Sequence, residues 1–107
     1  MKDDLSYLED MFEVSNWITK RVKDISRNDF DNDEVLRLAL AHQIQTIGEA
    51  ASKISTAIKE LHDPIPWREI IGVRQKIVHD YLDINYDEIW HVVKSDIPDL
   101  MKELEKS

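Results

Sequence analysis

Apolar residues recur three or four positions apart along most of this chain, and this spacing predicts helices. A first helix is predicted over about Asp4–Ile25. Its apolar stripe comprises Leu5, Leu8, Phe12, Ile18, Val22 and Ile25, with Ser15 filling one stripe position. The polar segment Asn28–Asn32 is predicted to be a connector, in which Asp31 or Asn32 would be the N-cap of the next helix.

The longest predicted helix runs over about Asp33–Leu61. Its apolar positions step by four and three residues in turn, a heptad-like pattern that predicts near-parallel packing against a neighbouring helix. These positions are Leu40, Ile44, Ile47, Ala51, Ile54, Ile58 and Leu61. A glycine inside a helix costs about 1 kcal/mol relative to alanine. Gly48, which lies among other small residues, therefore indicates a close approach by another backbone.

The segment His62–Pro66 is the clear break, because two prolines one residue apart end a helix and Pro66 can open the next one. A short helical segment, Trp67–Ile71, is predicted before Gly72, and a turn is predicted at Leu82–Asn85. A final helix begins near Tyr86, and Pro98 is expected to kink or divide it. The pattern as a whole predicts an all-α, up-down bundle of four to five helices in one domain spanning residues 1–107.

Composition and charge limit the classes of protein that this chain can be. Its 107 residues suit one domain, and its 42% hydrophobic and 34% charged content excludes a disordered or collagen-like chain. It has no cysteine and no apolar run approaching the roughly 20 residues that span a bilayer, so we expect a soluble cytoplasmic protein. The net charge of −8 argues against general attraction to nucleic acid, so any chemistry on RNA needs a local positive site.

The candidate chemistry lies in the eight residues from Arg74 to Tyr81. A guanidinium that binds phosphate, the His79 imidazole that titrates near neutrality and a phenol are the groups needed for metal-free chemistry at a phosphodiester. Arg74 and His79 are five positions apart, or about 140° around an ideal helix, so on one straight helix they do not converge. Arg74 and Tyr81, seven positions apart, would share a face.

Two arrangements could bring Arg74 and His79 together. Gly72 could place Arg74 in an irregular turn ahead of the helix, or two copies of the motif could meet across a dimer interface. The second arrangement would also concentrate the charge of two Arg74, two Lys76 and two His79 side chains in one cleft. Spacing alone leaves both open, and it also leaves open a purely structural role for these residues in ion pairs, caps and core packing.

The segment Pro66–Tyr81 resembles the signature of the HEPN superfamily, and more narrowly that of HepT, the toxin half of the HepT–MntA toxin–antitoxin pairs. The segments Ile44–Ala50 and Trp90–Leu104, the latter with its Asp-Ile-Pro step at 96–98, are similar to the same family. The likeness covers nearly the whole chain in the family's order. The spacing R-x4-H alone is a weak signal, but R-x4-H-x-Y after Pro-Trp-Arg-Glu-Ile is a specific one.

The resemblance implies a homodimer with both motifs in one cleft and a metal-independent endoribonuclease activity without a cofactor. Arg74 would hold the scissile phosphate, and His79 would act as general base or acid at the ribose 2′-OH or the leaving oxygen. Tyr81 would accept AMP from the partner nucleotidyltransferase, MntA, which would silence the cleft. RNA, with tRNA among the candidates, would be the substrate, and a larger hetero-oligomer with the antitoxin is one expected assembly.

Three further residues are supporting candidates. Gln75 follows the motif arginine where this family often has Asn or Asp, and it keeps the amide of Asn on a longer side chain. Lys76 would add positive charge, and Glu49 could orient Arg74 or His79 if the helix that carries it backs the cleft. No metal site is expected, because the other histidines lack ligand spacing. The alternative to an enzyme is a non-catalytic helical module that binds a nucleotidyltransferase partner.

The shared-cleft hypothesis predicts a dimer in solution. The apolar stripe and the small residues of the second predicted helix also provide more packing surface than one core needs. Light scattering at tens of micromolar protein should therefore give twice the mass of the chain. A monomer at that concentration would contradict a cleft built from two copies.

Overall fold

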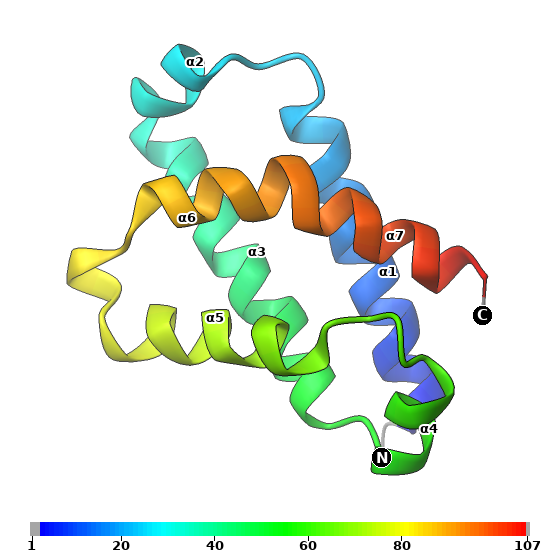
Figure 1. The fold of residues 1–107 in the computed structure, drawn as a ribbon. Coiled ribbons are helices and arrows are strands. Elements are labelled where there is room, and N and C mark those ends of the chain that lie inside the picture. Colours follow the sequence, from blue (N-terminus) through cyan, green and yellow to red (C-terminus); the bar gives the residue numbers. More distant parts are fainter. Residues whose placement is uncertain (1–2, 107) are drawn as a thin grey trace.

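The computed structural model describes residues 3–106, and of Tyr81 only the backbone. Within this part the chain is helical and has no strand, which confirms the predicted all-α bundle (Figure 1). The elements are α1 Asp4–Val22, α2 Arg27–Asp31, α3 Glu34–Ser52, α4 Thr56–Leu61, α5 Trp67–His79, the 3₁₀ helix η1 Tyr81–Asp83, α6 Tyr86–His91, the π-helical segment η2 Val92–Asp96 and α7 Ile97–Glu105.

Helix α3 is the centre of the bundle. It packs against α1 on one side and α5 on another, and the path from α6 through α7 crosses α1 (Figure 1). The most deeply buried side chains of the core include several from these elements: Met11, Ile18, Leu40, Ile47, Ile89 and Val93. No helix among residues 3–106 has the length and apolar character needed to cross a membrane.

Side-chain caps explain where most of the helices begin. In five helices the residue before the first turn accepts a hydrogen bond from the backbone N–H three positions later, which satisfies a donor that has no partner within the helix. These residues are Asp3, Ser26, Asp33, Ser55 and Asn85. The predicted cap of α3 at Asp31 or Asn32 is therefore wrong, because Asp33 holds that position.

The predicted connector at Asn28–Asn32 is also wrong, since most of it lies in helix α2. Ser26 and Asp29 form a reciprocal capping box that starts this helix. Its one core residue, Phe30, is fully buried and packs with its ring centroid 5.0 Å from that of Trp90. A five-residue helix with a single apolar side chain carries no periodicity, and the pattern of apolar residues therefore could not reveal it.

The predicted helix over Asp33–Leu61 is divided in the structure, because α3 ends at Ser52 and α4 starts at Thr56. Ser55 caps α4, and its backbone N–H and hydroxyl both donate to the Asp4 carboxylate, at 2.9 and 2.7 Å. The apolar stripe is buried as far as Ile54 and then surfaces, so that Leu61 is 75% exposed.

The last two helical predictions are partly corrected. Helix α5 runs without interruption through Gly72, where the sequence predicted an end. The final helix does begin at Tyr86, and it changes to a π-helical segment before Pro98, as expected of a residue that cannot donate a backbone hydrogen bond. Lys94 in this segment donates to the carbonyl oxygen of Val22 at 2.8 Å, and so binds the end of α1.

Replacing Phe30 by alanine should lower the free energy of unfolding by about 3–5 kcal/mol, because it leaves a cavity between α2, Tyr86 and Trp90. Urea unfolding measures this loss. The exposed Leu61, replaced by alanine, is the control and should change stability by no more than about 0.5 kcal/mol. Equal effects of the two substitutions would contradict the placement of α2 on the core.

Candidate functional site

Arg74 lies in the middle of α5 with its side chain against α3. Its Nη2 donates to Oε2 of Glu49 at 3.0 Å, and 28% of the Arg74 side chain is exposed. The other carboxylate oxygen of Glu49 lies 3.4 Å from Nζ of Lys53, the residue directly after the end of α3. The structure thus brings two of the sequence-predicted candidates, Arg74 and Glu49, into direct contact.

Two cationic side chains, those of Arg74 and Lys53, share the single carboxylate of Glu49 at this contact. Hydrogen bonds from Lys53 and then Arg74, together with the positive charge of both, hold the pKa of the Glu49 carboxyl below its usual range. Glu49 is therefore ionised at neutral pH and has two cationic partners. Sequence reasoning missed Lys53, although its spacing of four residues from Glu49 on one helix is the signal of such a pair.

His79 is the last residue of α5, and its side chain is exposed. Because α5 is a regular helix from Trp67 to His79, Arg74 does not stand in an irregular turn, and that predicted arrangement is wrong. The two residues lie about 140° apart around one helix, so they point in different directions. Of the two arrangements considered, the meeting of two copies stays as a prediction.

The remaining motif residues lie around the end of α5. Gln75 is exposed, and Lys76 places its Nζ 3.4 Å from Oε1 of Glu88 on α6. Tyr81 opens η1, and its side chain lies outside the described part of the structure. Lys76 is therefore paired with an acidic residue of its own chain. Within the described residues, the side chain of Gln75 makes no contact that links it to Arg74.

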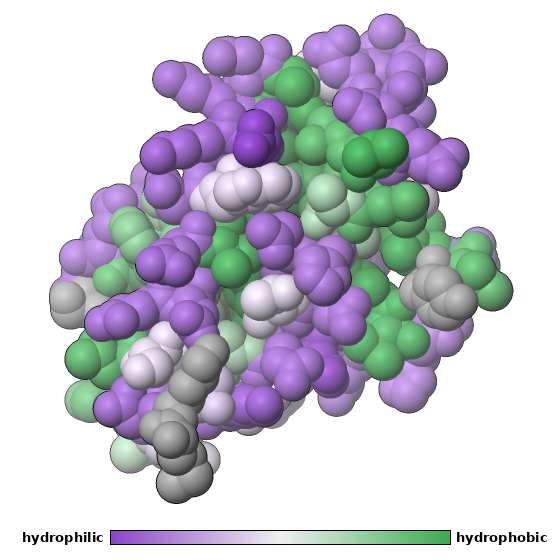
Figure 2. Space-filling model, turned by 180° about the vertical axis from the view of Figure 1, so that it is seen from behind, coloured by the Kyte–Doolittle hydropathy of each residue, from purple (hydrophilic) through white to green (hydrophobic). Residues whose placement is uncertain are grey.

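Exposed apolar side chains occur near the motif. Val78, next to His79, is 39% exposed, and Leu82 in η1 is 87% exposed. Seen from behind, hydrophobic side chains gather on the right-hand half of the molecule, over the end where α5 and η1 meet in Figure 1 (Figure 2). This end therefore offers apolar surface that the chain itself does not cover.

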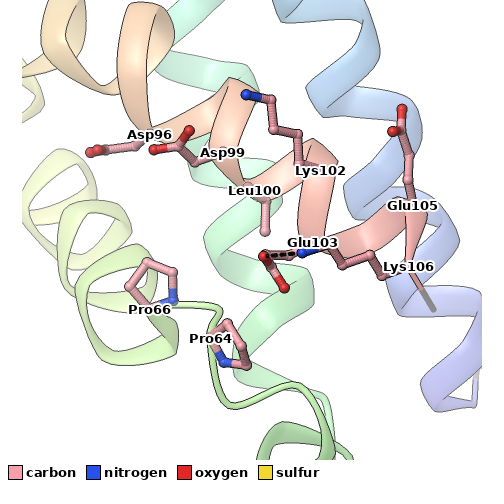
Figure 3. Close-up of a pocket in the computed structure, with 9 residues that line it drawn as sticks. All are labelled: Pro64, Pro66, Asp96, Asp99, Leu100, Lys102, Glu103, Glu105 and Lys106. Carbon is pink, nitrogen blue, oxygen red and sulfur yellow. Dashed lines mark hydrogen bonds and ion pairs between the residues drawn. The ribbon is translucent and has the colours of Figure 1, made fainter.

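A groove without these motif residues lies elsewhere, between the proline segment before α5 and one face of α7 (Figure 3). Pro64 and Pro66 form one wall, and Asp99 and Glu103 stand on the other, where Glu103 pairs with Lys106 at 3.1 Å. Neither Arg74 nor His79 lines it. Among residues 3–106, no group of three or more His, Cys, Asp or Glu side chains is placed to hold a metal ion.

Comparison with known proteins gives consistent matches over almost the whole chain. The family model described as "Ribonuclease HepT-like" matches residues 5–107. A protein named "Putative RNase" from Caldanaerobacter subterraneus subsp. tengcongensis is 37% identical over 106 residues, which are 99% of this chain and 95% of the relative. "Probable ribonuclease HepT" from Thermococcus cleftensis is 37% identical over 100 residues, 94% of this chain and 91% of the relative. No significant match was found among solved structures.

Replacing Arg74 by alanine should raise the pKa of the Glu49 carboxyl, without fully restoring its usual value because Lys53 remains. A carbon-detected NMR titration of the Glu49 carboxyl measures this change. Lys76→Ala is the control and should leave the Glu49 titration unchanged, since Lys76 pairs with Glu88.

The same contact gives a pH dependence of defined sign. Because the pKa of Glu49 is lowered in the folded chain, its ion pairs stabilise the fold above the usual pKa of a glutamate, about 4.3. This stabilisation is lost as the pH falls through the lowered pKa. A Glu49 titration that is identical in wild type and Arg74→Ala would contradict the observed pairing.

Proposed function

This chain belongs to the HepT-like ribonuclease family and is an endoribonuclease of that family, and we propose that it cleaves RNA without a metal ion, using Arg74 and His79. The family match over residues 5–107 is the observation that carries the proposal. The geometry supports it, because Arg74 is held on the core of the bundle while His79 is exposed at the end of the same helix.

In this mechanism the ribose 2′-oxygen attacks the adjacent phosphorus, and His79 takes the 2′-OH proton. The bond from phosphorus to the 5′-oxygen breaks, and that oxygen leaves with a proton supplied by the protonated imidazole of a second His79 or by water. The guanidinium of Arg74 holds the phosphate oxygens and stabilises the charge that develops on them. The products are a 2′,3′-cyclic phosphate and a 5′-hydroxyl end, so DNA, which lacks the 2′-OH, is not cut.

A homodimer would complete the site. Arg74 and His79 diverge on one helix, so a shared cleft needs the Arg74 of one copy near the His79 of the other. The exposed apolar side chains Val78 and Leu82 provide surface for such an association. Two copies would also place two sets of cationic side chains side by side, which offsets the charge of −8 on each chain.

The biological role in this proposal is that of a cytoplasmic toxin held inactive by a partner. A nucleotidyltransferase antitoxin of the MntA type would add AMP to the hydroxyl of Tyr81, with pyrophosphate leaving from ATP. Tyr81 lies two residues beyond His79, so a bulky anionic adduct there would block the cleft and reduce its positive charge. Binding of the antitoxin at Tyr81 would also join the two proteins in a larger hetero-oligomer.

The experiment is RNA cleavage in excess EDTA by wild type and by His79→Ala, after intact-mass analysis has shown that Tyr81 is unmodified. Several RNAs, including tRNA, serve as substrates. Wild type should leave cyclic-phosphate ends, and His79→Ala should be about 10²–10⁴-fold slower, the usual contribution of a general acid or base. His91→Ala, which alters an exposed histidine on α6, is the matched control and should cleave like wild type.

Two outcomes would contradict the proposal. Equal cleavage by wild type and His79→Ala would remove His79 from the chemistry. No cleavage of any RNA by unmodified wild type would instead favour the alternative, a helical module that binds a nucleotidyltransferase without cutting RNA.

A further inference from the structure

Gly48 lies buried on α3 directly beneath Arg74 of α5. If residue 48 carried a Cβ, that atom would overlap with the Cβ of Arg74 and would lie 3.0 Å from its Cγ and 3.2 Å from the carbonyl oxygen of Ile70. The overlap is with the root of the Arg74 side chain, which cannot rotate away, and the contact with the backbone oxygen of Ile70 would be tight. The two helices therefore approach each other at this point only because residue 48 has no side chain.

The far end of the same arginine is held by the next residue of α3. Glu49 accepts the hydrogen bond from Nη2 of Arg74 at 3.0 Å, and the Nε of Arg74 is buried without a hydrogen-bond partner among the described atoms. Two consecutive residues thus fix the two ends of one side chain. Gly48 sets the position of its root and Glu49 the position of its guanidinium, and the exposed 28% of the side chain is what can meet a ligand.

We propose that Gly48 is a positioning residue for Arg74, which places the guanidinium at the depth and angle needed to hold the scissile phosphate. This inference rests on the proposed ribonuclease function for its catalytic consequence. Any larger residue at position 48 moves α5 outward and separates the guanidinium from Glu49. A displacement of about 1 Å in a group that orients a substrate can cost about 10²-fold in rate.

The chain's other glycine provides a matched control. Gly72 also lies inside a helix, two residues before Arg74, but a Cβ at that position would meet nothing within 4 Å. Glycine is a poor helix former compared with alanine at both positions. Alanine therefore gains the same local propensity at either one, and only at position 48 does it meet Arg74.

The test compares Gly48→Ala with Gly72→Ala in the full chain, after circular dichroism and thermal unfolding have shown which variants are folded. The first readout is steady-state RNA cleavage in EDTA. Gly48→Ala should lose about 10²-fold in kcat/KM, while Gly72→Ala should match wild type. The second readout is the NMR titration of the Glu49 carboxyl, whose pKa should rise in Gly48→Ala, because Arg74 has withdrawn, and stay unchanged in Gly72→Ala.

The second readout separates this inference from the proposed function. If wild type cuts no RNA, the ribonuclease proposal fails, and the Glu49 titration still decides whether Gly48 positions Arg74. If Gly48→Ala does not fold, Arg74→Gly is added to remove the opposing Cβ, and recovery of a folded chain supports the contact. Wild-type cleavage together with an unchanged Glu49 titration in Gly48→Ala would overturn the inference, as would a double variant that stays unfolded.

Discussion

The packing of α5 on α3 determines where Arg74, the proposed phosphate-binding residue, is held. The two helices bury Ile44 and Ile47 of α3 with Ile70 and Val73 of α5, and this apolar contact holds α5 in one rotational setting. In that setting one face of α5 turns toward α3. Arg74 is on that face, so a charged side chain is held against the core by the burial of its neighbours and not by its own preference.

Electrostatics then decides what this arginine can do. A buried or half-buried cation needs an anionic or hydrogen-bonding partner. For Arg74 this partner is the carboxylate of Glu49, which also pairs with Lys53. Because the carboxylate has two cationic neighbours, the three groups together keep one positive charge. A chain with an overall charge of −8 thus retains a local cationic point at the residue that would meet a phosphate.

The long helices and the motif could be predicted from the sequence, but the rotation of α5 relative to α3 could not. Periodicity predicted α1, the extent of α3 up to its C-terminal end, and the final helix, and the residue types between Arg74 and Tyr81, together with the resemblance to a known family, indicated the candidate chemistry. Gly48 was correctly interpreted as a site of close approach, but the pattern gave no means of knowing that Arg74 is what approaches it. That depends on how α5 is rotated against α3, which is set by three-dimensional packing of side chains far apart in the chain.

Local capping explains most of the errors in the fold. Ser26 starts a helix that carries too few apolar residues to show a period, and Ser55 starts one whose apolar residues continue the spacing of α3 and so hide the break. The interpretation of Gly72 as a helix end gave too much weight to glycine as a breaker. At Gly72 the thirteen-residue helix continues because its neighbours on both sides pack on the core. A single glycine costs less than that burial contributes.

The π-helical segment before Pro98 constrains the number of residues between α6 and α7. The backbone N–H of Ile97 donates to the carbonyl of Val92, five residues back, so this turn holds one residue more than an α-helical turn. Each residue of an α-helix turns the chain by about 100°. Deleting one residue here would rotate α7 by about that angle, turning Leu100 and Leu104 away from the core and their charged neighbours toward it. The extra residue of this segment thus sets the rotation of α7 relative to α6, so that the apolar faces of both helices meet the core. The number of residues in the segment is constrained even where the identity of its side chains is not.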